Sequence, residues 1–193
     1  ERRRAVSALE ESERRYRNLY QHAQIGLFET HLAGATVIAC NQKYCDLFGF
    51  PSTGAAIGMD VLSLYAEPHD RALVSSRLHE AGYIEDYEVR FINRQTGRPF
   101  FARFSARLNR EKDIAEGTIV DISERKLAEE CLQKSEEAFR SLVLASADGI
   151  LLIDENGMVI EWNPALEEIL GISRTEAVGR PYIDILRQSL IPG

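Results

Sequence analysis

Residues 124–142 read ERKLAEECLQKSEEAFRSL, and residues 1–19 read ERRRAVSALEESERRYRNL. A shift of 123 residues aligns the two stretches with eight identical residues, and Gly26 then meets Gly149. After a one-residue gap, Asn41 corresponds to Asn163. This period is too long for a solenoid, whose units span a few tens of residues. We interpret it as a tandem duplication of a helix plus a domain, in which the second copy stops at Gly193, a little past its middle.

The repeated stretches predict helices. Residues 1–22 and 123–145 are rich in Glu, Arg, Lys, Ala and Leu and contain no Pro or Gly. The spacing of apolar and small residues is 4, 3, 4, 3, which is typical of a coiled-coil seam. The seam positions are Ala128, Leu132, Ser135, Phe139 and Leu142, and they repeat as Ala5, Leu9, Ser12, Tyr16 and Leu19. A helix packed on its own domain is the alternative.

Short strands and helices are expected between the two helical stretches. Residues 26–31 and 36–40 predict a hairpin, and residues 68–81 a helix that ends at Gly82. Alternating patterns in residues 87–91 and 100–108 predict two longer strands, and a third strand is predicted at 115–122, directly before the linker helix. Asn41 and Asn163 are predicted N-caps of short helices. Strand hairpins with segregated helices indicate an α+β domain.

Composition excludes several classes of partner. The formal net charge of −7 argues against nucleic-acid binding, which requires a basic surface. No apolar run approaches the roughly 18 residues that span a bilayer, so no membrane contact is expected. Cys40, Cys45 and Cys131 form no C-x-x-C pair, which fits a reducing compartment, and we expect a cytoplasmic location.

The sequence contains no catalytic motif: no phosphate-binding glycine loop, H-E-x-x-H or nucleophile elbow. The four histidines lack metal-ligand spacing with the cysteines, so no metal site of that kind is predicted. Cys45 is the formal candidate for the nucleophile of an acyl transferase. It lies between Tyr44 and Leu47 in a short helix, a setting typical of a small buried side chain. We predict that the chain is not an enzyme.

Four segments carry a resemblance to a known family. They are Tyr16-Arg17-Asn18-Leu19 with Ile25-Gly26-Leu27-Phe28; Asn41 followed by Leu47-Phe48-Gly49-Phe50; Pro68-His69-Asp70-Arg71; and Asp121-Ile122-Ser123-Glu124-Arg125-Lys126. Asn163 with Leu170-Gly171-Ile172 repeats the second of these. In this order and spacing they resemble the PAS domains of bacterial and archaeal sensor proteins, such as sensory histidine kinases and cyclic-dinucleotide enzymes.

The resemblance implies a PAS fold, with a five-stranded antiparallel sheet and helices on one face, flanked by an N-terminal and a linker helix. The expected layout is a signalling helix from an upstream domain at 1–15 and a complete PAS domain at 16–122. A helical coiled-coil-like linker follows at 123–138, and the N-terminal half of a second PAS domain at 139–193. We expect the apolar residues of this half, such as Ile150, Leu152, Ile160 and Trp162, to lack cover.

The resemblance also bears on cofactors. Flavin-binding relatives carry a cysteine in an N-C-R-F-L-Q context, whereas Asn41-Gln42-Lys43-Tyr44 stands here and Cys45 is displaced, so flavin is not expected. Haem-binding relatives use a His followed by Asp, as in His69-Asp70, but the aromatic residue that follows is missing. His69 therefore stays an alternative haem ligand beside a solvent-facing role, and the cofactor is unknown.

A pocket for a small organic ligand is predicted between the sheet and the helices. Its candidate residues are Phe28, Tyr44, Phe48, Tyr65, Val89, Phe91 and Phe104. Such residues either fill a core or line a cavity in which Tyr hydroxyls contact a ligand. The sequence leaves both readings open.

The output side is predicted at the junction Asp121, Ile122, Ser123 and Glu124. The Asp121 carboxylate is expected to accept a backbone N–H bond, with Glu124 completing a capping box. The resemblance implies a sensory module that senses a small ligand or relays movement through the linker helix. The recipient would be an effector domain in the same chain, such as a histidine kinase of a two-component system. A homodimer through the linker helices is expected, and a ligand-free dimerisation and protein-interaction module is the competing function.

Overall fold

The computed structural model describes the backbone of residues 2–190 and the side chains of residues 11–187. The chain forms two compact units, which divide between Leu127 and Ala128. The first unit contains one helix before a mixed domain of strands and helices, and the second contains a hairpin and short helices.

The first unit is built on a five-stranded antiparallel sheet. Its strands are β1 (Gly26–His31), β2 (Thr36–Cys40), β3 (Tyr83–Ile92), β4 (Pro99–Asn109) and β5 (Ile114–Asp121), in the spatial order β2-β1-β5-β4-β3. The predicted hairpin is confirmed with its predicted bounds, and the three later strands lie where they were predicted. Strand β5 is central, because β1 pairs with it on one side and β4 on the other.

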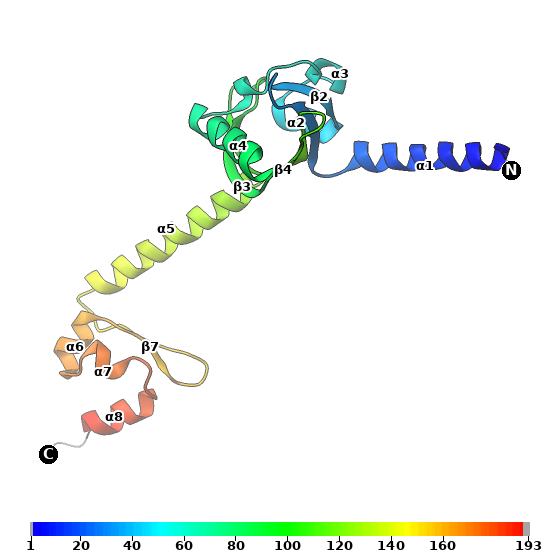
Figure 1. The fold of residues 1–193 in the computed structure, drawn as a ribbon. Helices are drawn as coiled ribbons and strands as arrows, with labels where there is room; N and C mark the ends of the chain where they lie inside the picture. Colours follow the sequence, from blue (N-terminus) through cyan, green and yellow to red (C-terminus); the bar gives the residue numbers. More distant parts are fainter. Residues whose placement is uncertain (1, 191–193) are drawn as a thin grey trace. The chain divides into compact units, whose positions relative to one another are not determined.

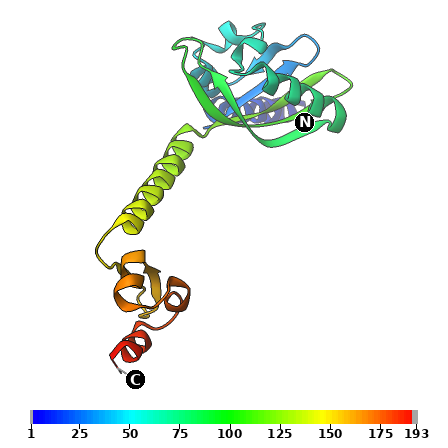
Figure 2. The same ribbon diagram turned by 90° about the vertical axis from the view of Figure 1, so that its left-hand side faces the viewer.

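Helices cover one face of this sheet (Figures 1 and 2): α2 (Gln42–Phe48), α3 (Thr53–Ala56), the 3₁₀ turn η1 (Leu62–Leu64) and α4 (Pro68–Ala81). Local sequence sets their ends. Asn41 caps α2 with its side chain, and Gly49 ends the helix in a left-handed conformation at φ 76°. Pro68 opens α4 and Gly82 ends it at φ 81°. The predicted α+β class is confirmed.

The core lies between the helices and one face of the sheet. The alternation predicted for β4 is confirmed, since Ala102, Phe104 and Ala106 are buried while Phe101 is exposed. Gly117 in the middle of β5 is required by close packing. A Cβ atom there would clash with the Ser105 carbonyl oxygen of the neighbouring strand.

Two long helices, α1 (Arg2–His22) and α5 (Ser123–Ala145), occupy the predicted helical stretches. Helix α5 follows β5 after the single residue Ile122 and runs as one unbroken helix (Figure 1). Its seam residues Leu132, Phe139 and Leu142 are exposed in the single chain. Seam residues Ala5 and Leu9 lie outside the described side chains. No described helix combines the length and apolarity needed to cross a membrane.

The second unit repeats the start of the first domain. It contains β6 (Leu151–Ile153), β7 (Val159–Trp162), α6 (Pro164–Leu170), α7 (Arg174–Ala177) and α8 (Tyr182–Leu190). The expectation that Trp162 lacks cover is wrong. Its side chain is fully buried in a small cluster with Val159, Ala177 and Ile185, and its Nε1 donates to the carbonyl of Ile172 at 3.0 Å. Helix α8 supplies the missing apolar surface through Ile185, whereas Ile160 is exposed, as expected.

Candidate functional site

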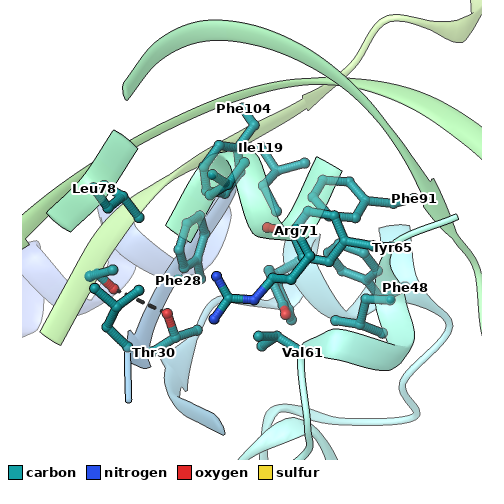
Figure 3. Close-up of a pocket in the computed structure, with 15 residues that line it drawn as sticks. Phe28, Thr30, Phe48, Val61, Tyr65, Arg71, Leu78, Phe91, Phe104 and Ile119 are labelled. Carbon is teal, nitrogen blue, oxygen red and sulfur yellow. Dashed lines mark hydrogen bonds between the residues drawn. The ribbon is translucent and has the colours of Figure 1, made fainter. Parts of the chain in front are cut away.

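A cavity of about 40 Å³ lies between the sheet and the helices of the first domain (Figure 3). The sheet contributes residues from β1, β3, β4 and β5, and the other side comes from α2, η1, α4 and the segments beside them. The lining residues are Phe28, Thr30, Leu32, Tyr44, Phe48, Val61, Leu64, Tyr65, Arg71, Val74, Leu78, Phe91, Phe104, Ala115 and Ile119. Most of them are apolar or aromatic, as in small-molecule sites.

The structure brings six of the predicted pocket residues to this cavity: Phe28, Tyr44, Phe48, Tyr65, Phe91 and Phe104. Val89 is buried in the same core but does not line the cavity. The aromatic rings contact one another, with ring centres 5.5 Å apart for Phe28 and Phe104 and 4.8 Å apart for Tyr65 and Phe91. Such ring pairs resist displacement of any one member and give the cavity a defined wall.

Two tyrosines supply hydroxyl groups to the lining. Burial raises the pKa of Tyr65 to about 12, and it raises the pKa of Tyr44 further. Both phenols therefore stay protonated at neutral pH and keep an O–H to donate. The hydroxyl of Thr30 also lies at the cavity and donates to the carbonyl of Ala115 at 3.5 Å, the dashed line in Figure 3.

Arg71 is the one charged residue among the lining residues that the sequence did not identify, which also include Thr30, Leu32, Val61, Leu64, Val74, Leu78, Ala115 and Ile119. It lies in the first turn of α4, and Figure 3 shows its guanidinium reaching across the cavity toward Phe28 and Thr30. Its Nε is buried and has no hydrogen-bond partner among the described residues. A sequence signal exists, because Val74 and Leu78 lie three and seven residues further on and are buried. That spacing places Arg71 on the inward face of α4.

The cofactor alternatives do not fit this cavity. His69 is exposed and is not a lining residue, and a volume of about 40 Å³ is far below the several hundred Å³ of sites for larger ligands.

Cys45 is fully buried, with its Sγ 3.7 Å from the Sγ of Cys40. Burial raises the pKa of both thiols, that of Cys40 to about 12, so neither is an activated nucleophile.

The junction between β5 and α5 is tied to the neighbouring strand β4. The Asp121 carboxylate accepts a hydrogen bond from the Ser123 backbone N–H at 2.8 Å, as predicted. The Ile122 N–H donates to the Phe101 carbonyl at 2.9 Å, and the Phe101 N–H donates to Ser123 Oγ at 3.0 Å. Three of the four predicted relay residues therefore hold the start of α5 against the sheet.

Glu124 does not make the predicted capping contact among the described residues, and Glu88 of β3 provides a different anchor. The carboxylate of Glu88 lies 2.5 Å from Arg125 and 2.5 Å from Lys126 in the first turn of α5. Hydrogen bonding from Lys126, with a further contribution from Arg125, lowers the pKa of Glu88. The sequence signal was the outward position of Glu88 in the alternating strand, which does not by itself identify a partner.

Comparison with known families follows the same division of the chain. A family model described as "PAS domain" matches residues 14–81, and one described as "PAS fold" matches residues 137–189. The chain belongs to the PAS family. Each match begins near the end of a long helix and covers the following hairpin and helices, so the internal repeat corresponds to two PAS sequences. PAS domains form a sensory fold rather than a catalytic one.

Individual relatives agree with this assignment. Sporulation kinase E of Bacillus subtilis (strain 168) is 24% identical over 175 residues, which is 91% of this chain and 23% of that kinase. A solved PAS domain from Colwellia psychrerythraea is 21% identical with a TM-score of 0.51, over 57% of this chain and 97% of that structure. An RNA-binding light-oxygen-voltage receptor is 17% identical with a TM-score of 0.53, over 64% of this chain and 37% of the receptor. The two structural likenesses bear on the PAS fold alone.

Proposed function

We propose that this chain is the sensory part of a longer signalling protein, such as a histidine kinase, and that occupancy of the cavity changes the position of helix α5. One observation supports this above all: strand β5 both lines the cavity and leads directly into helix α5. Ala115 and Ile119 of β5 line the cavity, and α5 starts at Ser123. A side chain that a ligand displaces is thus four residues from the helix that leaves the domain.

Strand β4 gives a second route between the same two places. Phe104 lines the cavity and is paired with Ile119 of β5. The backbone of Phe101, three residues earlier on β4, accepts a hydrogen bond from the Ile122 N–H and donates one to the Ser123 hydroxyl. Because backbone hydrogen bonds fix the register of β4 against β5, a shift at Phe104 and Ile119 changes the angle at which α5 begins.

The domain layout is part of this proposal. Residues 16–122 would be a complete PAS sensor, and residues 123–138 the linker that passes its state to a second PAS domain, which begins at 139. Residues 1–15 would play the same linking role for a domain upstream. Effector activity would reside elsewhere in the parent protein.

A ligand-free dimerisation module is the second candidate, because α5 carries an unpaired apolar stripe. Leu132, Phe139 and Leu142 are 62%, 53% and 72% exposed, and their spacing is that of a coiled-coil seam. A second copy of this chain is the occupant that such a self-complementary seam fits. In this reading the cavity is a packing defect and α5 transmits a signal that arises upstream.

Native mass spectrometry and an absorbance spectrum of the purified chain separate the two functions. An additional small-molecule mass on the native protein, lost on denaturation, supports the sensor. A Soret band would show bound haem and would contradict the conclusion that His69 is not a haem ligand. Three results together would refute the sensor and support the dimerisation module. The native mass would be that of the unmodified protein, the spectrum would show no visible absorbance, and no cavity ligand would change amide exchange in residues 123–127.

A further inference from the structure

The inward-facing arginine defines the chemistry of the cavity. The guanidinium of Arg71 reaches into a space lined by Phe28, Val61 and Val74, and its Nε has no described hydrogen-bond partner. The arginine guanidinium does not lose its proton in proteins and therefore stays charged at neutral pH. A buried guanidinium nitrogen without a partner is unfavourable, because it loses water and gains no hydrogen bond in exchange.

The acidic residues nearest to Arg71 in sequence are engaged elsewhere. Glu67 forms an ion pair with Arg90 at 3.0 Å, and Asp70 accepts a hydrogen bond from the Tyr87 hydroxyl at 2.9 Å. Figure 3 shows the Arg71 side chain extending among the aromatic residues of the cavity. Asp70 acts electrostatically on Tyr65, but no described carboxylate forms an ion pair with Arg71. The Arg71 guanidinium therefore presents a positive charge to the cavity without a directly paired counter-charge among the described residues.

The other lining groups restrict what an anion there must look like. Tyr65 and Tyr44 have hydroxyls that no described residue binds, so each has a proton to donate to an oxygen atom. Apart from Thr30, whose hydroxyl donates to the Ala115 carbonyl, the remaining lining is aliphatic or aromatic and favours a ligand with an apolar part. A volume of about 40 Å³ equals only a few water sites of about 10–15 Å³ each. The ligand is therefore a molecule of a few non-hydrogen atoms.

We propose that the cavity binds a small monocarboxylate of two to four carbons, with its carboxylate on the Arg71 guanidinium and its alkyl group against the aromatic wall. Planar guanidinium and carboxylate groups pair through two parallel hydrogen bonds. The Tyr65 hydroxyl would donate a further bond to the same carboxylate. This inference rests on the proposed function, since it identifies the class of ligand for the same cavity.

The test uses the 193-residue chain, sodium propionate and its neutral analogue 1-propanol, at constant ionic strength set with sodium chloride. Backbone amide chemical shifts are followed during each titration, together with acetate, butyrate and inorganic phosphate. Saturable shifts in α4 and β5 with propionate, and weaker binding of 1-propanol, are expected. Phosphate should not compete, because it lacks an apolar part and carries more charge than one arginine balances.

The variants R71Q and R77Q separate the cavity charge from a general surface charge. Arg77 lies on the same helix but is exposed, with its guanidinium 5.8 Å from the ring centre of Tyr87. R71Q should weaken propionate binding about tenfold or more while R77Q leaves it unchanged, and R71K should retain part of the affinity. Removing an uncompensated cation should not lower the melting temperature, so loss of binding in R71Q would not reflect unfolding.

Each other outcome overturns the inference and identifies what failed. If 1-propanol binds as well as propionate, or R71Q binds propionate as the wild type does, the anion class is wrong and the sensor proposal stands. If none of the probes binds, the monocarboxylate class is refuted. The native mass spectrum then shows whether the cavity holds another ligand or whether the sensor proposal has failed too.

Discussion

Asn41 and Asn163 make the same four hydrogen bonds in the two units. The Asn41 side chain accepts from the N–H groups of Leu27 and Tyr44 and donates to the carbonyls of Tyr20 and Ile25. The Asn163 side chain accepts from Ile150 and Leu166 and donates to Val143 and Asp148. Both side chains are fully buried, so every polar atom of each amide is used.

These two asparagines therefore do more than cap a short helix. Tyr20 and Val143 lie in the last turns of α1 and α5, so each amide joins the preceding long helix to the hairpin and to the helix that follows. One buried side chain fixes the point where a long helix meets the hairpin and the short helix that follow it. Under the proposed function, a movement of α1 would reach the first domain through Asn41. A movement of that domain would then reach α5 through the junction after β5.

Replacement of Asn41 by alanine should destabilise the first domain by about 3 kcal/mol, because it leaves buried N–H and carbonyl groups unpaired. The slowest amide protons of β5 should exchange on the order of 100 times faster as a result. Gln42→Ala is the matched control, since Gln42 bonds only to exposed Asp46 at 2.9 Å. Equal exchange rates in the two variants would contradict the role of Asn41.

Glu88→Gln should loosen the first turn of α5, because the carboxylate that Arg125 and Lys126 share loses its charge. Amide exchange at Ser123–Leu127 should rise at neutral pH, while Glu85→Gln on the same strand should leave it unchanged. Glu85 pairs with Arg107 instead. The idea fails if both variants exchange alike.

The ion pairs of Glu88 with Arg125 and Lys126 also predict a pH dependence. The folded-state pKa of Glu88 is lowered, so its contribution to stability is complete above the ordinary carboxyl value of about 4.3. That contribution is lost as the pH falls through the lower folded value. Carbon-detected NMR titration should therefore give Glu88 a pKa below 4.3 in wild-type protein and a return toward it in Arg125→Gln/Lys126→Gln. A wild-type Glu88 carboxyl that titrates at the ordinary value would contradict these ion pairs.

Asp121→Ala should weaken coupling through the linker while the core stays folded, because only the bond to the Ser123 N–H is lost. The expected cost is about 1 kcal/mol, as for other helix-start caps. Output activity of the full-length parent protein, measured with and without stimulus, gives the result. Unchanged regulation in the variant would show that this contact does not carry the signal.

Leu132→Glu with Phe139→Glu should convert a dimer to a monomer, because two charges then lie in the apolar seam of α5. Sedimentation equilibrium of the purified chain measures this. Gln133→Glu adds charge to the same helix outside the seam positions and should leave the dimer intact. A wild-type chain that stays monomeric at high concentration would rule out this seam as a dimer interface.

Much of the fold follows from local sequence, because its decisive signals are local. The bounds of β1, β2 and α4 were predicted from turn residues, Pro68 and Gly82, which act on their immediate neighbours. The burial of Trp162 was not predicted, because it depends on contact with Ile185, which lies 23 residues further along the chain. Glu88 was missed for the same reason, since its partners lie on another element.

Arg71 shows a different limit. Its place in the Pro68-His69-Asp70-Arg71 segment indicated only the start of a helix, whereas its spacing to Val74 and Leu78 indicates the buried face. A charged residue at an inward position conflicts with the usual pattern of burial. The structure resolves the conflict by leaving a cavity beside the guanidinium, and a cavity is a property of packing that no single stretch of sequence encodes.

The central claim is that the contents of the cavity set the state of α5, and Val74→Leu tests it without a ligand. The added methylene enters the cavity from α4, while Ala72→Leu adds bulk to the exposed side of the same helix. We predict that amide exchange at Ser123–Leu127 changes about tenfold, equivalent to about 1.4 kcal/mol, in Val74→Leu alone. If exchange in β1 and β5 responds to Val74→Leu while Ser123–Leu127 does not, the cavity and α5 are not coupled.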